Sequence, residues 1–272
     1  MNILITAGGT SEAIDKVRSI TNHSTGRLGS IIADFFANRS AAITYVCGHH
    51  AALPQSGNIE IIRISNVQEL SQTISMLLKK NKYDCVIHSM AVSDFTPQAV
   101  LTLSDIIESV ASTLASSLQK HPTNDELRAA IKSATATLPG TKLSSKTQEP
   151  LILLTQTPKI INQIKTLQPN TTLVGFKLLS GATEADLLQA ATNLMTQANC
   201  DFVLANDLQN IQGDTHKAIL LDKAGNTTRA ATKQEIAKTI YKAITHHHQN
   251  NTRAKRSHNS PSSKQPASEA KQ

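Results

Sequence analysis

Tryptophan is absent from this chain of 272 residues, and aromatic residues of all kinds make up only 3% of it. Its core must therefore be built from aliphatic side chains, which is usual for a parallel sheet covered by helices. The hydrophobic content of 39% is enough for one large α/β domain. No apolar run is long enough to span a membrane, and residues 1–10 lack the basic start of a secretion signal. We expect a cytoplasmic protein that makes no membrane contact.

Cysteine is scarce as well. The three cysteines, Cys47, Cys85 and Cys200, lie at or near the ends of apolar runs and never in C-x-x-C spacing. This pattern argues against a disulfide framework and against a zinc site. We interpret all three as buried thiols. The run His246-His247-His248 also predicts no metal site, because three adjacent side chains do not share one face of a helix.

Acidic residues are fewer than basic ones, and the formal net charge is +7. Residues 246–272 contain five Lys/Arg and one Asp/Glu, which gives +4, so residues 1–245 carry only +3. That value is ordinary for a protein that handles phosphorylated ligands. The basic end lacks interleaved aromatic residues and an amphipathic pattern, so we expect no nucleic-acid partner.

The sequence contains no G-x-G-x-x-G motif after its first strand and no Walker loop, but two glycine loops stand near its N-terminus. Gly8 and Gly9 follow the apolar run 2–6, where backbone amides can approach a ligand without a Cβ in the way. Ser24, Gly26 and Gly29 precede a run with helical spacing, whose free N–H groups and positive dipole end attract anions. The two loops predict the front of a nucleotide site.

The order of residues 5–29 resembles the signature of phosphopantothenoylcysteine synthetase, the phosphopantothenate-cysteine ligase of coenzyme A biosynthesis. The strand, the Gly-Gly-Thr turn, Glu12, Ile14-Asp15, Val17-Arg18, Asn22 and the Ser-x-Gly-x-x-Gly loop follow one another without gaps. Further matches are Met-Ala-Val-Ser-Asp-Phe at 90–95, Lys-Leu-Ser-Ser at 142–145, Thr-Pro-Lys-Ile-Ile at 157–161, Val-Gly-Phe-Lys at 174–177 and Leu-Ala-Asn-Asp at 204–207. The resemblance spans roughly residues 1–245.

The resemblance implies a reaction in two halves and two catalytic residues. A carboxylate of 4'-phosphopantothenate attacks a nucleoside triphosphate to give an acyl nucleotide, and the amine of cysteine then attacks the acyl carbon. Lys142 would stabilise charge at the α-phosphate in the first half, and Asn22 would hold the acyl carbonyl in the second. Without the resemblance, Lys142 reads as a solvated loop lysine and Asn22 as a turn residue or helix cap.

The binding residues implied by the resemblance extend over all matched loops. Substrate contacts fall on Asn22, Ala91 and Asn206. Nucleotide contacts fall on Gly8, Gly9, Ser24, Gly26, Gly29, Met90, Ala91, Asp94, Pro158, Lys159, Ile160, Ile161 and Phe176. Asp94 could accept a hydrogen bond from the base or hold Mg²⁺, or it could merely cap a loop, and Phe176 could be a core residue instead. The sequence departs from the family at Met90, and at Leu194 and Ala198, where bifunctional members carry lysines.

The resemblance also implies the co-substrate and the partners. We expect CTP, with ATP as the alternative, bound with Mg²⁺ and without a flavin. The ligase signature begins at residue 2, so a separate phosphopantothenoylcysteine decarboxylase is expected to act next. A homodimer is implied, because late strands help to build the dimer contact in the family. Two other functions stay open, an NAD(P)-dependent reductase and a non-catalytic nucleotide-sensing protein.

The rest of the chain predicts a doubly wound, Rossmann-like, mostly parallel sheet with helices on both faces. Strands are expected at 2–6, 42–47, 59–64, 84–88, 151–155, 172–176 and 201–205. Helix starts are expected at Asn66, Thr183 and Thr232, each with an acid three residues later. Residues 98–139 predict a helical insertion that either packs or acts as a lid, and 217–222 with 226–230 predict a late hairpin. We expect one ligase domain over 1–245 and a disordered basic tail over 246–272.

Overall fold

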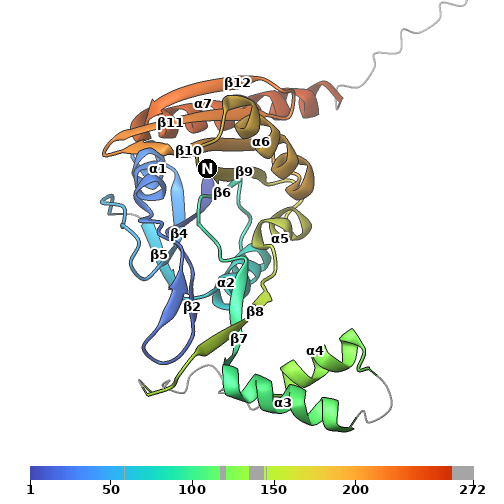
Figure 1. Ribbon diagram of the computed structural model, residues 1–272. Coiled ribbons are helices and arrows are strands. Elements are labelled where there is room, and N and C mark those ends of the chain that lie inside the picture. Colours follow the sequence, from blue (N-terminus) through green and yellow to red (C-terminus); the bar gives the residue numbers. More distant parts are fainter. Residues whose placement is uncertain (58, 117–120, 135–143, 145, 259–272) are drawn as a thin grey trace, which may run out of the picture.

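The protein is built around an eight-stranded sheet (Figure 1) in the order β12-β11-β10-β9-β6-β1-β4-β5. The computed structural model describes residues 1–57, 59–116, 121–134, 144 and 146–258. Six neighbouring strands of the sheet are parallel, namely β10 (Phe202–Gln212), β9 (Thr172–Leu179), β6 (Cys85–His88), β1 (Asn2–Ala7), β4 (Ala42–Gly48) and β5 (Ile59–Ile64). The expected hairpin, β11 (Thr215–Asp222) with β12 (Thr227–Thr232), completes one edge in antiparallel pairing. The predicted fold class is confirmed.

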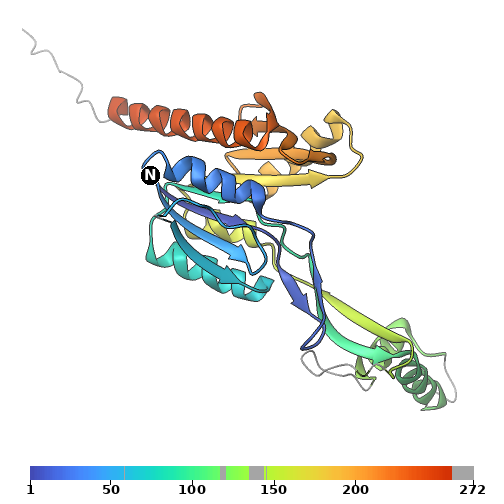
Figure 2. The same cartoon turned by 90° about the vertical axis from the view of Figure 1, so that its left-hand side faces the viewer.

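Helices cover both faces of the sheet (Figures 1 and 2). One face carries α1 (Arg27–Ala37) and α7 (Lys233–His258), and the other carries α2 (Val67–Lys80), α5 (Ile160–Leu167) and α6 (Glu184–Ala198). Alternate residues of one strand serve the two layers, because Ile3 and Ile5 pack in the first core cluster and Leu4 in the second. Both clusters are mainly aliphatic, and Cys47, Cys85 and Cys200 are buried free thiols.

The three expected helix starts are confirmed. The side chain of Asn66 accepts a hydrogen bond from the backbone N–H of Glu69, which starts α2. Thr183 forms a full capping box with Asp186 at the start of α6. The hydroxyl of Thr232 accepts from the backbone N–H of Glu235, 3.2 Å away, at the start of α7. Each cap satisfies a backbone donor that the first turn of a helix leaves free.

A separate ribbon extends away from the sheet and carries two helices at its far end (Figures 1 and 2). The ribbon pairs β7 (Phe95–Thr102) with β8 (Pro150–Gln156) in antiparallel orientation, and α3 (Leu103–Ser116) and α4 (Asn124–Ser133) follow β7. The helical insertion is therefore real but begins at residue 103 and not at 98. The strand expected at 151–155 exists, but it pairs outside the central sheet. A short hairpin, β2 (Ser11–Ala13) with β3 (Ser19–Thr21), packs against β7 through β2.

The last helix continues past residue 246, where we expected a disordered tail to begin. The helix α7 runs to His258. The ring of His247 packs edge-on against Phe202 with centroids 5.7 Å apart, and His248 shares a 3.3 Å hydrogen bond between its Nε2 and the hydroxyl of Thr172. These contacts hold the polar end of the helix against the sheet. The helix therefore continues past its last aliphatic core residue, Ile244. In the described part of the chain, no helix is both long and apolar enough to cross a membrane.

Candidate functional site

The loops after β1 and β6 meet at the point where the strand order reverses. After β1 the chain proceeds outward to β4 and β5, and it then returns to β6 on the other side of β1. Ligands of open α/β sheets bind outside the carboxyl ends of the strands at such a point. There the backbone N–H of Ala91 donates to the carbonyl of Gly8 at 2.8 Å, and that of Thr10 donates to the carbonyl of Ala91 at 3.2 Å. The structure thus brings two of the predicted nucleotide loops together.

The glycines of both loops permit a backbone approach that no other residue allows. Gly8 has a φ of +82°, and a Cβ there would lie 2.6 Å from the Cβ of Ala51. Gly26, the N-cap of α1, has a φ of +70°, and its Cβ would lie 2.9 Å from the same methyl group and 3.1 Å from the backbone nitrogen of Gly8. The start of α1 is therefore held directly beside the first loop, which follows the carboxyl end of β1.

Asn22 lies between the two glycine loops. Its side-chain nitrogen Nδ2 donates to the carbonyl of Ala91 at 3.2 Å, and its own carbonyl accepts from the N–H of Ser24 at 2.8 Å. The residue is exposed, and a Cβ on Gly9 would come within 2.9 Å of the Asn22 carbonyl oxygen. The structure therefore brings together Asn22 and Ala91, two predicted substrate contacts, at the edge of the glycine loops.

Asp94 and Lys159 form an ion pair beside these loops, with 2.6 Å between Nζ and Oδ1. Both side chains are about two-thirds exposed, at 64% and 63%. The two loops are also joined through Thr157, whose N–H donates to the carbonyl of Asp94 at 3.0 Å and whose hydroxyl donates to the carbonyl of Ser93 at 2.5 Å. Ser93 in turn donates its N–H to the hydroxyl of Thr10 at 2.9 Å. Hydrogen bonds between three loops thus hold Asp94 and Lys159 at the mouth of the site.

Asp94 offers the exposed carboxylate that a nucleotide-bound Mg²⁺ could use. Magnesium in nucleotide sites is held by one or two carboxylates together with substrate phosphates. Among the described residues, no group of three His, Cys, Asp or Glu side chains could hold a metal ion. Asp94, which pairs with Lys159, is thus the residue of these loops whose carboxylate would contact a Mg²⁺ bound to a nucleotide.

Most of the other predicted nucleotide residues are buried or half-buried near these loops. Gly29 is buried, and a Cβ there would lie 2.4 Å from the Cβ of Ala7, so this glycine lets α1 pack closely on β1. Met90 and Ile160 are buried in the second core cluster, and Phe176 packs half-buried against the first. Ile161 is half-buried against the same second cluster, and Pro158 is exposed next to Lys159. Lys142 lies outside the described residues.

The predicted substrate residue Asn206 is buried and contacts a histidine of the adjacent strand. Its side-chain Nδ2 lies 3.0 Å from Nε2 of His216, and both residues are 5% exposed. Burial, and secondarily the ammonium of Lys233, lowers the pKa of His216 to about 4, so its ring is neutral near pH 7. The other ring nitrogen, Nδ1, is buried and has no hydrogen-bond partner among the described residues. In this structure Asn206 is thus oriented by a buried neutral histidine.

A cationic cluster beside the start of α1 was missed by the sequence analysis. Lys233 is 6% exposed, its Nζ donates to the carbonyl of Gly213, and burial lowers its pKa. Arg27, the first residue of α1, pairs with Asp214 at 3.3 Å, and the backbone carbonyl of Asp214 accepts from the N–H of Lys233. Arg27 could have been noticed, since it lies within the second glycine loop. The sequence around Lys233 carries no such signal.

The assembled site is a set of backbone amides, one exposed carboxamide and the Asp94–Lys159 ion pair around the carboxyl ends of β1 and β6. Fixed dipoles and cations of this kind stabilise negative charge that develops on phosphate or carbonyl oxygens. The residues gathered here are Gly8, Gly9, Asn22, Ser24, Gly26, Ala91, Asp94 and Lys159. The arrangement suits transfer reactions of anionic substrates.

Comparison with known proteins agrees with this geometry. The chain is 31% identical over 245 residues to the coenzyme A biosynthesis bifunctional protein CoaBC of Thermococcus kodakarensis, a match that covers 89% of this chain and 50% of the relative. The chain thus spans about half the length of that curated relative. The crystal structure of the DNA/pantothenate metabolism flavoprotein from Streptococcus pneumoniae superimposes with a TM-score of 0.76 at 34% identity, covering 91% of this chain and 99% of that chain.

A Cab2 mutant in complex with phosphopantothenate-cysteine superimposes with a TM-score of 0.63 at 15% identity, covering 91% of this chain and 88% of that chain, which shows a shared fold. Residues 1–104 and 129–247 match the family described as the DNA/pantothenate metabolism flavoprotein C-terminal domain. The family resemblance expected from the loop series is therefore confirmed, and the chain belongs to the DNA/pantothenate metabolism flavoprotein C-terminal domain family.

Proposed function

We propose that this protein is a phosphopantothenate-cysteine ligase of coenzyme A biosynthesis, which uses CTP and forms an acyl-nucleotide intermediate. The observation that carries the proposal is the position of Asn22, whose carboxamide lies between the two glycine loops and contacts Ala91 at 3.2 Å. The family membership and the CoaBC relative support the same pathway.

In the first half of the reaction, a carboxylate oxygen of 4'-phosphopantothenate attacks the α-phosphorus of CTP and pyrophosphate leaves. Backbone N–H groups of the glycine loops and of the start of α1 bind the phosphates, because they lie at the positive end of a helix dipole. Lys142 supplies a cation to the charge that develops at the α-phosphorus. This role rests on the sequence resemblance of the loop at 142–145.

In the second half, the amine of cysteine attacks the acyl carbon and CMP leaves. Negative charge develops on the acyl oxygen, and a neutral carboxamide N–H can stabilise it. Asn22 is exposed beside the loops, and its Nδ2 has a second N–H besides the one that Ala91 accepts. Asn22 therefore acts in this half.

We also propose that Lys159 supplies a triphosphate contact that some relatives place elsewhere. The positions aligned with the lysine pair of bifunctional members are not available to a ligand, since Leu194 packs against the core and Ala198 is 3% exposed. Lys159 is exposed at the mouth of the site, 2.6 Å from Asp94. A Mg²⁺–nucleotide would compete with Lys159 for the Asp94 carboxylate and leave the ammonium free for a phosphate.

The proposed assembly is a homodimer. The ribbon β7–β8 extends away from the sheet and exposes large apolar side chains. Phe95, Leu151, Ile152 and Leu154 are 39–49% exposed on it. Exposed apolar side chains of this size favour a protein contact along the ribbon, and a second copy would supply it. The product, phosphopantothenoylcysteine, would then pass to a separate decarboxylase.

The test is release of pyrophosphate from CTP and from ATP, with Mg²⁺, in the presence and absence of 4'-phosphopantothenate and cysteine. We expect release that requires 4'-phosphopantothenate, is faster with CTP, and yields the ligated product by mass spectrometry only when cysteine is present. Titration with NADPH in parallel examines the reductase alternative. Absence of pyrophosphate release with both nucleotides would contradict the ligase proposal.

A further inference from the structure

A cavity separate from the candidate site lies between the β11–β12 hairpin and α7. It has a volume of about 800 Å³, within the usual range of small-molecule sites. Its lining includes Phe202 at the start of β10 and Lys223 in the hairpin turn, so it opens where β10 begins. The candidate site lies at the opposite, carboxyl end of the parallel strands. We call this cavity the α7 groove.

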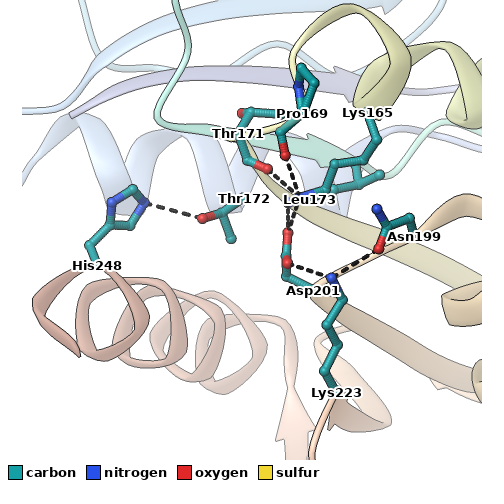
Figure 3. Close-up of polar contacts among 9 residues, drawn as sticks. All are labelled: Lys165, Pro169, Thr171, Thr172, Leu173, Asn199, Asp201, Lys223 and His248. Carbon is teal, nitrogen blue, oxygen red and sulfur yellow. Dashed lines mark hydrogen bonds and ion pairs between the residues drawn. The ribbon is translucent and has the colours of Figure 1, made fainter. Parts of the chain in front are cut away.

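The acidic side chains of the α7 groove are already engaged by the protein. Asp201 accepts from the backbone N–H of Leu173 at 2.8 Å and forms ion pairs with Lys165 at 2.6 Å and Lys223 at 3.0 Å (Figure 3). These partners hold the pKa of Asp201 below its usual value despite its burial. Figure 3 also shows His248 of α7 directed at Thr172 beside this network. The carboxylate is therefore neutralised from within the fold.

The other two acids are committed as well. Asp222 accepts from the backbone N–H groups of Ala224 at 2.9 Å and Asn226 at 2.8 Å, within its own turn. Glu235 accepts from the backbone N–H of Ala231 at 2.7 Å. Among the described residues, neither carboxylate forms an ion pair with Lys238 or Lys242.

Lys238 and Lys242 line the groove one helical turn apart on α7. Among the described residues, neither has an ion-pair or hydrogen-bond partner, and both are exposed. Like charges at this spacing repel each other and destabilise a helix slightly. A bound anion between the two ammonium groups would remove that repulsion. The hydroxyl groups of Thr228 and Thr239 line the same groove and can donate hydrogen bonds to phosphate oxygens.

We propose that the α7 groove binds a small phosphate ester, with its phosphate between Lys238 and Lys242 and its less polar part against Phe202 and Leu220. This site goes beyond the proposed ligase reaction and is separate from the catalytic loops. The ring of His247, which lines the same end of the groove, packs edge-on against Phe202. A lining that combines cations with apolar side chains suits a phosphate joined to an apolar or planar group.

The test uses the full chain and AMP as the probe, with backbone amide shifts recorded by NMR. We expect saturable shifts at Ala224, Asn226, Thr239 and Ala243, and none there with adenosine, which lacks the phosphate. The double variant K238E/K242E should weaken AMP binding at these amides by about tenfold or more. The matched control K79E/K80E, which reverses two exposed lysines at the end of α2, should bind like the original protein.

Three results would overturn the proposal. Shifts confined to the loops around Gly8 and Gly26 would mean that AMP binds only at the catalytic end. Groove shifts that survive K238E/K242E, or that adenosine produces equally, would mean that the lysines form an ordinary solvated helix face. If the double variant does not fold, K242Q alone provides the same comparison, with an expected loss of several-fold affinity that the charge-matched K80Q does not show.

Discussion

Asn22 and Ala91 are 69 residues apart in the sequence, and the Nδ2 of Asn22 donates to the carbonyl of Ala91 at 3.2 Å. The same carbonyl accepts from the N–H of Thr10, so the Ala91 loop is bound from both sides. One N–H of the carboxamide is thereby occupied, which orients the group and leaves the other N–H for a substrate oxygen. The orientation of this carboxamide is therefore fixed by the Ala91 loop, beside the glycine loops.

The first prediction concerns the division of roles between Asn22 and Lys142. Asn22→Asp should still form the acyl nucleotide but transfer it slowly to cysteine, because an anionic carboxylate cannot stabilise the developing oxyanion. Lys142→Ala should suppress formation of the acyl nucleotide itself, by about 10²-fold or more for the loss of one such contact. Quenched reactions with and without cysteine, analysed by mass spectrometry, measure the intermediate directly.

The outcome that contradicts this division is an equal loss of intermediate in both variants. In that case Asn22 and Lys142 would act on the same step, even if the overall ligase activity were confirmed. A slow Asn22→Asp variant could result from the lost N–H donor or from the added negative charge. Asn22→Ala separates these two causes, since it removes the donor without adding a charge.

The second prediction concerns Lys159 as a phosphate contact. Lys159→Met should raise the KM for the nucleotide by about tenfold, the usual size of the loss of one charge-assisted contact, and should leave the KM for cysteine unchanged. Lys177→Met is the matched control. Like Lys159, Lys177 is exposed, but it lies near the end of β9 and the ion-pair partner of Asp94 is Lys159. Initial rates at varied CTP concentrations measure the KM of both variants. A raised KM for Lys177→Met alone would mean that Lys177, and not Lys159, contacts the phosphates.

The central sheet could be predicted from the sequence because its inner strands, such as β1 and β4, are apolar runs buried on both faces. The pairing of β8 could not, since residues 151–155 read like any other strand and nothing local identifies the partner at 95–102. The start of the helical insertion was placed at residue 98 and not at 103, because the strand β7 was not recognised. Ala99, Val100 and Leu101 are buried in β7, although their spacing also suits a helix.

The site could be predicted as a set of loops but not as a set of contacts. Glycine positions revealed where backbones approach, and Asn22, Ala91 and the Asp94 loop do meet. Asn206 was expected to face the substrate, yet it lies against His216, ten residues later in the adjacent strand β11. Only the register between β10 and β11 places these two side chains together, and register is not visible in a single sequence.

The third prediction tests the close packing of α1 on β1. Gly29→Ala would place a Cβ 2.4 Å from the Cβ of Ala7 and 2.9 Å from Oγ of Ser89. We expect a loss of about 1–3 kcal/mol in the free energy of unfolding, as for other overpacked sites. The control is Gly57→Ala, since nothing lies within 4 Å of a Cβ there. Equal urea midpoints for the two variants would show that α1 shifts freely and that Gly29 has no packing role.

The fourth prediction concerns the pH dependence of stability through His216. Its pKa is lowered by burial to about 4 in the folded state, below the unfolded value of 6.5. As the pH falls from 6.5 toward 4, the unfolded state binds a proton that the folded state does not, so stability is lost over this window by up to about 3 kcal/mol. Above pH 6.5 this contribution is constant. His88, whose pKa is also lowered by burial to about 4, adds a loss of the same sign.

His216→Gln should therefore show a shallower loss of stability between pH 6.5 and 4 than the original protein, in urea unfolding at several pH values. The variant keeps a hydrogen-bonding group near Asn206 but cannot take up a proton. His23→Gln, at an exposed position, is the control and should leave the slope unchanged. A His216→Gln slope identical to that of the original protein would show that His216 does not remain neutral in the fold.

The last prediction concerns the end of α7, where residues 246–258 form a helix in place of the first part of the expected tail, and residues 259–272 lie outside the described residues. A chain that ends after Asn250 keeps the His247 contact with Phe202 and the His248 hydrogen bond to Thr172, so its stability and its ligase rate should stay within about twofold of the full chain. A chain that ends after Thr245 loses both contacts and should be less stable by about 1–2 kcal/mol. Thermal unfolding of the two truncated chains, which differ by only five residues, measures this difference in stability. Equal stabilities would mean that the two histidine contacts contribute nothing. The folded domain would then end near residue 245, as the composition alone predicts.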